Sequence, residues 1–286
     1  MTLMRQIGVA IFANVLVVCP LWILWMTFGT PLQLAAPRTK DSLTSSQQGT
    51  LAQLEFLDQV RKQHSRESSD TGGWRFYHGA IDKNSIVYSF GLGTDISFDE
   101  YLIKHFGCHV HGFDNTPVHS AWWLKKRHAL PSDTLSHFHR HEFLLGAVDG
   151  DLQVGLPAGH LTSYAVSSAS AKGFTAGRNV KLPARTLATL MSSLQHARVD
   201  VCKVDIEGAE FDIFQQMARA SGADSHPFPV CQLLIEFHSR LVPLGYAAKA
   251  EAIIHLESLG FALIHNVVMP DGADNALFVN PSFCKI

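Results

Sequence analysis

The chain of 286 residues has little charge and few cysteines. Charged residues make up 17% of it, and the formal net charge of -2 leaves no basic excess to neutralise nucleic-acid phosphates, so no nucleic-acid partner is expected. The five cysteines include no C-x-x-C pair and do not indicate a disulfide framework. Cys202 and Cys231 each lie in an apolar run, where a buried free thiol is expected. No Asn-x-Ser/Thr glycosylation site with a permitted middle residue occurs.

Hydrophobic residues, by contrast, make up 47% of the chain and include one long run. Residues 7–28 contain no charged side chain and are numerous enough to cross a bilayer as a helix. We predict a transmembrane anchor there, preceded by a short tail of residues 1–6. A cleaved signal peptide is the alternative, because Leu34-Ala35-Ala36 offers small residues for cleavage. In either case we expect the rest of the chain in the secretory pathway, on the lumenal or extracellular side, or secreted.

Residues 29–73 have the composition of a stem between this anchor and a folded domain. The segment from Thr30 to Ser46 is rich in Pro, Ser and Thr. Apolar residues then recur at helical spacing, which predicts an amphipathic helix over residues 50–63. We place the start of the folded domain at Trp74 and its end at residue 286.

Short apolar runs alternate with helical segments from Trp74 onward, a pattern typical of a mostly parallel α/β sheet with helices on both faces. Strands are predicted at Ile86–Phe90, His109–Phe113, Phe143–Val148, Val199–Val204 and Val230–Phe237, followed by an antiparallel hairpin of Phe261–Val268 and Ala276–Val279. The helix after the first strand is predicted to end at about His105, and the helix after the second strand to begin at Pro117. Further helices are predicted at Arg185–His196, Ala209–Ala220 and Tyr246–Leu259. Leu152–Val154 is predicted to pair back on the third strand, and 155–179 to form a loop or lid.

A glycine turn after the first strand and an acid after the second indicate a ligand that contains ribose. Gly91 and Gly93 let a ligand approach the backbone, and Asp114 follows about 20 residues later, where a carboxylate can bind both ribose hydroxyls. The third glycine of the dinucleotide fingerprint is replaced by Ile96, which favours a ligand without a pyrophosphate. Ala147 and Val148, at the end of the third predicted strand, are candidates for an apolar wall against an adenine ring.

A second group of polar residues follows the fourth and fifth strands. Lys203-Val-Asp-Ile-Glu-Gly-Ala-Glu210 places acids directly after a buried strand, and Glu236-Phe237-His238 ends the next strand. Asp205 and His238 are candidate bases, and Glu207 and Glu236 are candidates for binding the hydroxyl groups of a substrate. Glu210 is interpreted as a carboxylate that stabilises the N-terminus of the following helix.

Metal binding stays open at two places. Asp205, Glu207 and Glu236 can also form an oxygen-rich site for a divalent cation. The alternating His137, His139 and His141 can bind zinc, although an exposed lead-in to the third strand is the favoured interpretation because no acid or cysteine with ligand spacing accompanies them.

Several motifs, in this order, resemble those of the FkbM-type methyltransferases, and among these the membrane-anchored methyltransferase-like 24 group. They are YSFGLGTDISFDEYL from Tyr88, VHGFDNTP from Val110, the Leu-Pro-Ala-Arg-Thr-Leu run from Leu182, DVCKVDIEGAE from Asp200 and LLIEFH from Leu233. The resemblance covers about Trp74 to the C-terminus. It implies a Rossmann-like, seven-stranded class I methyltransferase sheet with a reversed final strand, and S-adenosylmethionine as the methyl donor.

The resemblance also implies a donor site, in which Gly91 and Gly93 match the family's glycine loop, Asp114 its ribose acid and Asp205 the acid beside the donor. The full set of predicted donor residues is Ser89, Gly91, Leu92, Gly93, Asp95, Asp114, Asn115, Ala147, Val148 and Asp205. Two positions depart from the family pattern, because Ser89 stands where an acid is usual and Asp95 where a third glycine is usual. Either Asp95 replaces the missing acid, or donor affinity is reduced.

The sequence therefore predicts an S-adenosylmethionine-dependent methyltransferase acting on an oxygen of a small molecule, glycan or lipid. Two alternatives remain. A degenerate methyltransferase fold that only binds its ligand is suggested by Ser89 and Asp95. A nicotinamide-dependent oxidoreductase is disfavoured by Ile96 and by the acids that follow the fourth and fifth strands.

Overall fold

The computed structural model describes residues 45–63, 73–156, 164–165, 178–220, 228–242, 245–268 and 273–285. The predicted anchor at residues 7–28 and most of the predicted lid at 155–179 lie outside this range. No helix within it has the length and apolar character needed to cross a membrane. The chain divides into a unit of Met1–Gln48 and a unit of Gly49–Ile286, and the features below belong to the second unit.

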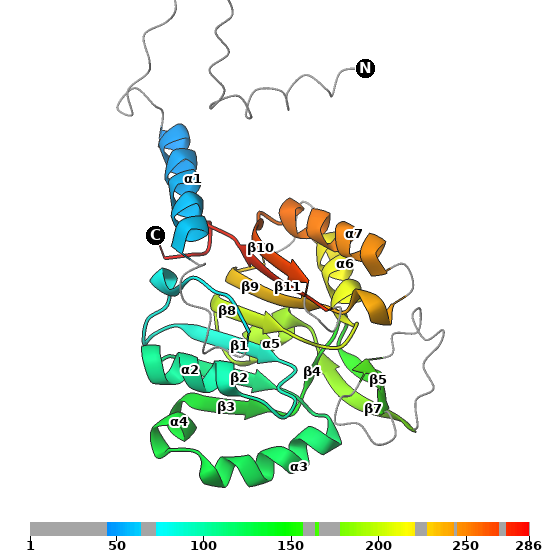
Figure 1. Cartoon of the computed structure of the whole chain (residues 1–286). Helices are drawn as coiled ribbons and strands as arrows, with labels where there is room; N and C mark the ends of the chain where they lie inside the picture. Colours follow the sequence, from blue (N-terminus) through cyan, green and yellow to red (C-terminus); the bar gives the residue numbers. More distant parts are fainter. Residues whose placement is uncertain are drawn as a thin grey trace, which may run out of the picture. The chain divides into compact units, whose positions relative to one another are not determined.

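Seven strands form one sheet in the order β10-β11-β9-β8-β1-β2-β3 (Figure 1). Their bounds are β1 Ile86–Phe90, β2 His109–Phe113, β3 Phe138–His141, β8 Val199–Val204, β9 Val230–Phe237, β10 Ala262–Val268 and β11 Asp274–Val279. β11 is antiparallel to both neighbours, whereas the pairs that join β9, β8, β1, β2 and β3 are parallel. The predicted Rossmann-like methyltransferase sheet with a reversed last strand is confirmed.

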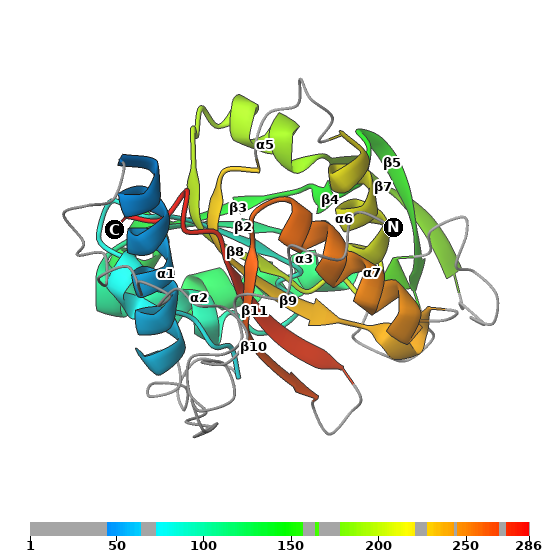
Figure 2. The same cartoon turned by 90° about the horizontal axis from the view of Figure 1, so that it is seen from above.

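Helices cover both faces of this sheet. They are α1 Ser45–Gln63, α2 Ser97–Phe106, α3 Pro117–Lys126, α4 Ser132–His137, α5 Leu187–Ser193, α6 Glu210–Ala220 and α7 Gly245–Ser258. Side chains of α1, α2 and α3 pack with Val87 and Val110 in one core, and those of α5, α6 and α7 pack with Tyr88 and Phe90 in the other. Figure 2 shows α1 and α2 on one side of the sheet and α6 and α7 on the other.

Local sequence explains where the helices nearest the site begin and end. Pro117, whose missing N–H costs nothing in the first turn, opens α3 as predicted. Gly107 ends α2 in the left-handed conformation, at φ 65°. The hydroxyl of Thr186 accepts a hydrogen bond from Thr189 N and caps α5, so this helix is shorter than the predicted Arg185–His196.

The third strand of the main sheet was predicted at the wrong place. β3 is formed by Phe138–His141, the stretch interpreted as an exposed lead-in. Its residues alternate between the two faces of the sheet, because Phe138 packs in one core while His141 stacks on Phe113 in the other. Most of the apolar run predicted as this strand is not strand at all, and its last residue, Val148, is 64% exposed.

A second, four-stranded sheet follows β3, in the order β4-β7-β5-β6. It consists of β4 Leu144–Leu145, β5 Gly150–Leu156, β6 Tyr164–Ala165 and β7 Arg178–Arg185. The segment around Leu152 therefore pairs with β7 and β6 and does not fold back on the third strand as predicted. The Leu-Pro-Ala-Arg run at Leu182 is part of β7.

The expectation of a free thiol at Cys231 is wrong, because Cys231 and Cys284 form a disulfide across a sequence separation of 53. β11 runs antiparallel to β9, so the chain that leaves β11 passes the start of β9, where Asn280 N donates to Cys231 O at 2.8 Å. That register brings the two cysteines together. Cys202 is a buried free thiol, as predicted.

The predicted helix over residues 50–63 is present as α1, which extends back to Ser45. Its Phe56, Leu57 and Val60 are buried in the core that also contains α2. Gln59 Nε2 donates to the hydroxyl of Tyr77 at 3.0 Å. The compact unit accordingly begins at Gly49 and includes the part of α1 that makes these contacts.

Candidate active site

An open cavity of about 210 Å³ lies at the carboxyl ends of β1, β2 and β8. In a parallel sheet this is where ligands bind. It is lined by Gly91, Gly93, Thr94, Phe113, Asp114, Thr116, His119, Leu144, Leu145, Leu152, Val154, Asp205, Ile206, Glu207 and Ala209. Gly91, Gly93, Asp114, Asp205 and Glu207 were predicted as site residues, and the structure brings all five to this one cavity.

The glycine turn after β1 lies directly against the acidic turn after β8. Gly91 has φ 77°, and a Cβ atom there would lie 1.7 Å from the carbonyl oxygen of Asp205. Asp205 N donates to Phe90 O at 3.2 Å. Gly93, at φ 56°, has open space where a Cβ would be. Glycine is therefore required at 91 for backbone packing, and at 93 it leaves room in the cavity.

Asp114 holds the glycine turn in place. Its carboxylate accepts hydrogen bonds from Gly93 N at 3.1 Å, from Thr116 N at 2.8 Å and from His119 Nδ1 at 2.8 Å. Burial opposes the charged form, but the bonds from His119 and from the two backbone N–H groups outweigh it and lower the pKa of Asp114. Asp114 is therefore ionised, and one of its roughly four acceptor positions is left for a ligand.

The apolar wall of the cavity is formed by residues that the sequence reasoning missed. Leu144 and Leu145 of β4, and Leu152 and Val154 of β5, line it. Ala147 and Val148, predicted for this role, do not. The prediction was wrong because the chain enters the second sheet directly after β3, and that places the two leucines at the cavity.

Four other predicted donor residues do not line the cavity with their side chains. Asp95 is exposed and accepts from the N–H of Ser97, the first residue of α2, at 2.8 Å, so its carboxylate is bonded at the start of this helix and does not replace an acid in the site. Leu92 is buried in the core. Ser89 is fully buried within β1, and Asn115 lies outside the cavity lining.

The acidic turn after β8 has an unusual backbone. Glu207 adopts φ 53° and Gly208 φ 100°. The left-handed conformation is costly for a residue with a side chain. Glu207 is held there between Asp205 and the start of α6, and its side chain lies at the cavity. Glu210, the first residue of α6, is fully buried.

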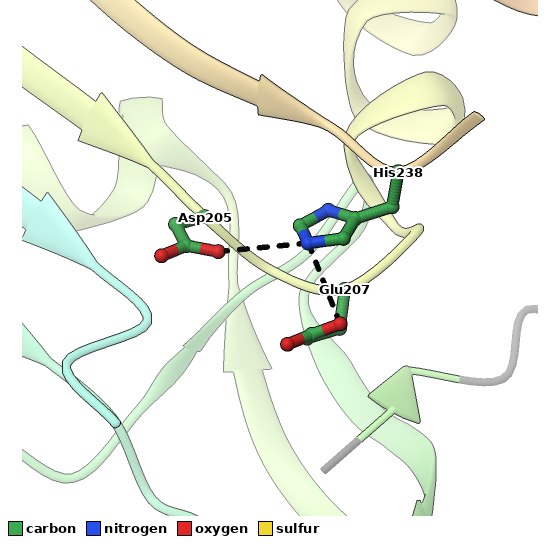
Figure 3. A group of neighbouring side chains, drawn as sticks. All are labelled: Asp205, Glu207 and His238. Carbon is green, nitrogen blue, oxygen red and sulfur yellow. Dashed lines mark ion pairs between the residues drawn. The ribbon is translucent and has the colours of Figure 1, made fainter. Parts of the chain in front are cut away.

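His238, which directly follows β9, lies among several carboxylates, of which Figure 3 shows Asp205 and Glu207. Its Nε2 lies 3.8 Å from Asp205 Oδ1, 3.4 Å from Glu207 Oε2 and 3.6 Å from Glu236 Oε1. Its Nδ1 bonds to Glu210 Oε1 at 3.1 Å, and its backbone N donates to the same oxygen at 2.7 Å. We call Asp205, Glu207, Glu210 and Glu236 the carboxylate cluster. Glu210 therefore holds His238 as well as the helix terminus, a role the sequence did not indicate.

The carboxylate cluster sets the charge of His238. Burial favours the neutral ring, but the hydrogen bond to Glu210 and the charges of the surrounding carboxylates outweigh it and raise the pKa of His238 to about 9. At neutral pH the ring is an imidazolium. His238 is then a cation that pairs with the acids, which leaves Asp205 as the remaining candidate base.

The donor atoms are also close enough to hold a metal ion. Ligand atoms of Asp205, Glu207 and His238 all lie within 4.8 Å of one another, and no other group of three or more such side chains is found in the part of the chain that the structure describes. This group differs from the oxygen-rich set predicted from Asp205, Glu207 and Glu236, because it contains the imidazole of His238 and not Glu236.

A second group of histidines lies on β2, β3 and the segments beside them. His109 Nδ1 is 3.1 Å from His139 Nε2, and His111 Nδ1 is 3.0 Å from His141 Nε2. We call these four rings, together with His137 and His196, which contact them, the histidine row. Burial, and then the neighbouring imidazoles, lower the pKa of His111 to about 3, and the same causes lower the pKa of His139 and His141.

Comparison with known proteins adds family information to this geometry. Residues 80–263 match the family model of the methyltransferase FkbM domain. The chain is 24% identical over 197 residues to the probable methyltransferase-like protein 24 of Homo sapiens, which covers 66% of this chain and 44% of that protein. The Rattus norvegicus protein of the same name is 23% identical over 196 residues, with the same shares covered. The chain therefore spans less than half the length of these relatives.

Solved structures show similar but distant folds. The crystal structure of methyltransferase FkbM from Methylobacillus flagellatus is 14% identical, with a TM-score of 0.45, and covers 79% of this chain and 50% of that one. The Aeropyrum pernix fibrillarin structure, solved with natively bound S-adenosyl-L-methionine, is 10% identical, with a TM-score of 0.38, and covers 70% of this chain and 68% of that one.

Proposed function

We propose, from the premise that this chain belongs to the FkbM family of methyltransferases, that it moves a methyl group from S-adenosylmethionine to a hydroxyl oxygen of a small molecule, glycan or lipid. One observation carries the proposal. The glycine turn and the acidic turn are in backbone contact, so the candidate donor residues Gly91 and Gly93 and the candidate base Asp205 share one cavity.

The residues at the first crevice fit an S-adenosylmethionine donor. Gly93 leaves space at the backbone, and the ionised, buried Asp114 keeps an acceptor position for ribose hydroxyls. Leu144 and Leu145 offer an apolar surface for an adenine ring. When bound, the donor supplies a methyl group activated by a sulfonium.

Asp205 is the residue placed to accept the acceptor's proton. The Asp205 carboxylate would take the proton of the acceptor hydroxyl, while a bound donor would supply the methyl group by losing its carbon–sulfur bond as the carbon–oxygen bond forms, leaving a neutral thioether. His238 is protonated and does not act as a base in this scheme. Its charge and its bond to Glu210 fix the position of the Asp205 and Glu207 side chains.

The charge of the site favours a neutral acceptor. Asp205 and Glu207 both line the cavity, and Glu236 lies behind them at His238. Carboxylates accept hydrogen bonds from hydroxyls but repel phosphates and other carboxylates. We therefore favour a hydroxyl acceptor over a carboxyl acceptor.

A divalent cation is a second way in which the same residues can activate the acceptor. Asp205, Glu207 and His238 would hold it, with Glu210 on Nδ1 fixing the ring as carboxylates do for metal-bound histidines. Such an ion would lower the pKa of a hydroxyl bound to it. The direct test is thermal unfolding of the full chain after chelation and after addition of Mn²⁺ or Zn²⁺, compared between the wild type and Glu207→Gln. A stabilisation confined to the wild type supports a cation, and none in either excludes it.

Calorimetry with the full chain tests the donor assignment. We expect S-adenosylhomocysteine to bind, and Asp114→Ala to weaken its binding at least tenfold. Binding that Asp114→Ala does not change would contradict the assignment, and absence of binding would favour a degenerate fold. Preferential binding of NAD would favour an oxidoreductase.

Transfer of labelled methyl groups to a panel of glycosides and hydroxylated lipids tests the base. Asp205→Asn keeps the shape of the side chain but cannot take the proton. We expect transfer to fall at least a hundredfold while S-adenosylhomocysteine affinity changes little. Full activity in this variant would refute the role of Asp205.

The Cys231–Cys284 disulfide supports the proposed location in the secretory pathway. Disulfides persist in oxidising compartments and are rare in reducing ones. Together with the predicted anchor at residues 7–28, it favours a lumenal or extracellular domain. Protease protection of the full chain in microsomes tests the topology, and digestion without opening the membrane would contradict a lumenal domain.

A further inference from the structure

Lys203 is a buried cation that none of the steps above uses. It lies in β8, where every residue is buried, and it is itself 5% exposed. A buried ammonium is costly unless it is paired and hydrogen-bonded. Its partners should therefore show why the chain keeps a lysine there.

Two of those partners, Gly91 and Asp205, line the cavity, one in the glycine turn and the other in the acidic turn. Lys203 Nζ donates to Gly91 O at 3.1 Å and lies 3.4 Å from Asp205 Oδ2. It also lies 4.9 Å from the centre of the Trp74 ring, within the range of a cation–π contact. One ammonium thus joins the carbonyl of the glycine turn to the side chain of the candidate base.

A further buried acid interacts electrostatically with this cation. Asp99 in α2 is 1% exposed, and burial raises its pKa to about 6, while the charge of Lys203 and the hydroxyl of Ser89 act against this rise. The carboxylates of Asp99 and Asp205 therefore both interact electrostatically with the ammonium of Lys203. Asp205 in turn lies between Lys203 at Oδ2 and His238 at Oδ1.

We propose that Lys203 is a positioning residue of this site, which fixes the Gly91 carbonyl and the Asp205 carboxylate relative to each other. The inference rests on the proposed function, because that function assigns donor binding to the turn of Gly91 and proton transfer to Asp205. Loss of the ammonium frees both groups at once. It should therefore affect donor binding and methyl transfer together.

The full chain allows a matched comparison of two lysines. Lys249 in α7 also pairs with a buried acid, Asp274, at 3.1 Å, and lies 5.7 Å from the ring of Phe237, but neither of these partners lines the cavity. Lys203→Met and Lys249→Met each remove a largely buried ion pair together with its aromatic contact. Lys203→Arg keeps the charge, and Lys203→Gln keeps only a neutral donor.

The measurement is calorimetric titration with S-adenosylhomocysteine, with unfolding by urea as the check on folding. We expect Lys203→Met to bind at least tenfold more weakly than the wild type, Lys203→Gln to be nearly as weak, and Lys203→Arg to recover part of the loss. Lys249→Met should lose stability but bind as the wild type does. Where acceptor turnover is measurable, kcat should fall in Lys203→Met and recover in part in Lys203→Arg.

Two results overturn the inference. Wild-type affinity in Lys203→Met would show that the ammonium does not position the donor turn, and if that variant does not fold, wild-type affinity in Lys203→Gln would show the same. Equal losses of affinity in Lys203→Met and Lys249→Met would show a purely structural role. Failure of the wild type to bind S-adenosylhomocysteine is a different outcome, which removes the proposed function and this inference with it.

Discussion

His238 and His111 are both buried, with exposed fractions of 1% and 8%, yet their surroundings drive them to opposite charge states. The carboxylate cluster raises the pKa of His238 to about 9. In the histidine row, burial and the neighbouring rings lower the pKa of His111 to about 3. Burial disfavours the charged ring in both places. The difference therefore comes from the neighbours, and the two regions should respond in opposite ways to pH and to substitution.

The largest effect is expected from Glu210→Gln, which removes the buried charge that pairs with His238. Breaking a buried ion pair costs about 3–5 kcal/mol because the remaining charge stays buried. We expect a loss of at least the lower figure in the unfolding free energy, measured with urea. Glu236→Gln is the control, since its side chain is 20% exposed and should cost under about 1 kcal/mol. Equal losses would show that Glu210 acts only at the helix terminus.

Alkaline pH should weaken the carboxylate cluster region. The pKa of His238 is raised above its unfolded value of about 6.5, so its contribution to stability is complete below that value and is lost as the pH rises through about 9. We expect the unfolding free energy to fall by about 2–3 kcal/mol between pH 7 and pH 10. A His238→Asn variant should lack this part of the pH dependence. An identical slope in that variant would contradict the assignment.

Acid should weaken the histidine row instead. The pKa of His111 is lowered below its unfolded value, so its contribution is present above about pH 6.5 and is lost as the pH falls towards 3. We expect His111 alone to cost about 2 kcal/mol of unfolding free energy between pH 7 and pH 5. His111→Phe, whose ring would lie beside Tyr88, should reduce this loss, whereas replacement of the exposed His128 by Asn should not. A pH profile unchanged in His111→Phe would count against this account.

The smallest effect separates function from stability within the acidic turn. Glu207→Gly relieves the left-handed backbone and should stabilise the protein by about 1 kcal/mol, while methyl transfer falls because a carboxylate is lost from the cavity. Gln195, at φ 58°, is the other residue with a side chain at positive φ among those described, and Gln195→Gly should stabilise similarly without changing transfer. Thermal unfolding and transfer assays on both variants check this. A loss of stability in Glu207→Gly would show that the side-chain contacts outweigh the strain.

Much of the sheet was readable from the sequence because most of its strands are rich in apolar residues and have clear ends. β1, β2, β8 and β9 have the predicted bounds, and their ends are marked by Gly91, Asp114, Asp205 and His238. β3 was missed because histidines occupy the positions that face the second core. Half-buried strands of this kind lack the apolar signal on which the prediction depends.

The site was predicted only where a residue's position along a strand determines its place. Asp205 and Glu207 follow a strand end, so their place at the crevice could be inferred. His119 in α3 contacts Asp114, and Glu210 at the start of α6 contacts His238 after β9. Both contacts depend on how these elements pack against each other. The Cys231–Cys284 bond likewise depends on the register of β9 and β11.

The contacts that build the cavity also differ in how far apart in the sequence their residues lie. The bond from Gly93 to Asp114 joins residues 21 apart, whereas the contact between Lys203 and Gly91 spans 112 residues. Contacts between distant residues form slowly because a long loop must be ordered first. During synthesis, a chain that ends before β8 can already build the glycine turn with Asp114 but lacks the acidic turn that lies against it. The β1–β8 pairing is therefore the folding step on which assembly of the cavity depends.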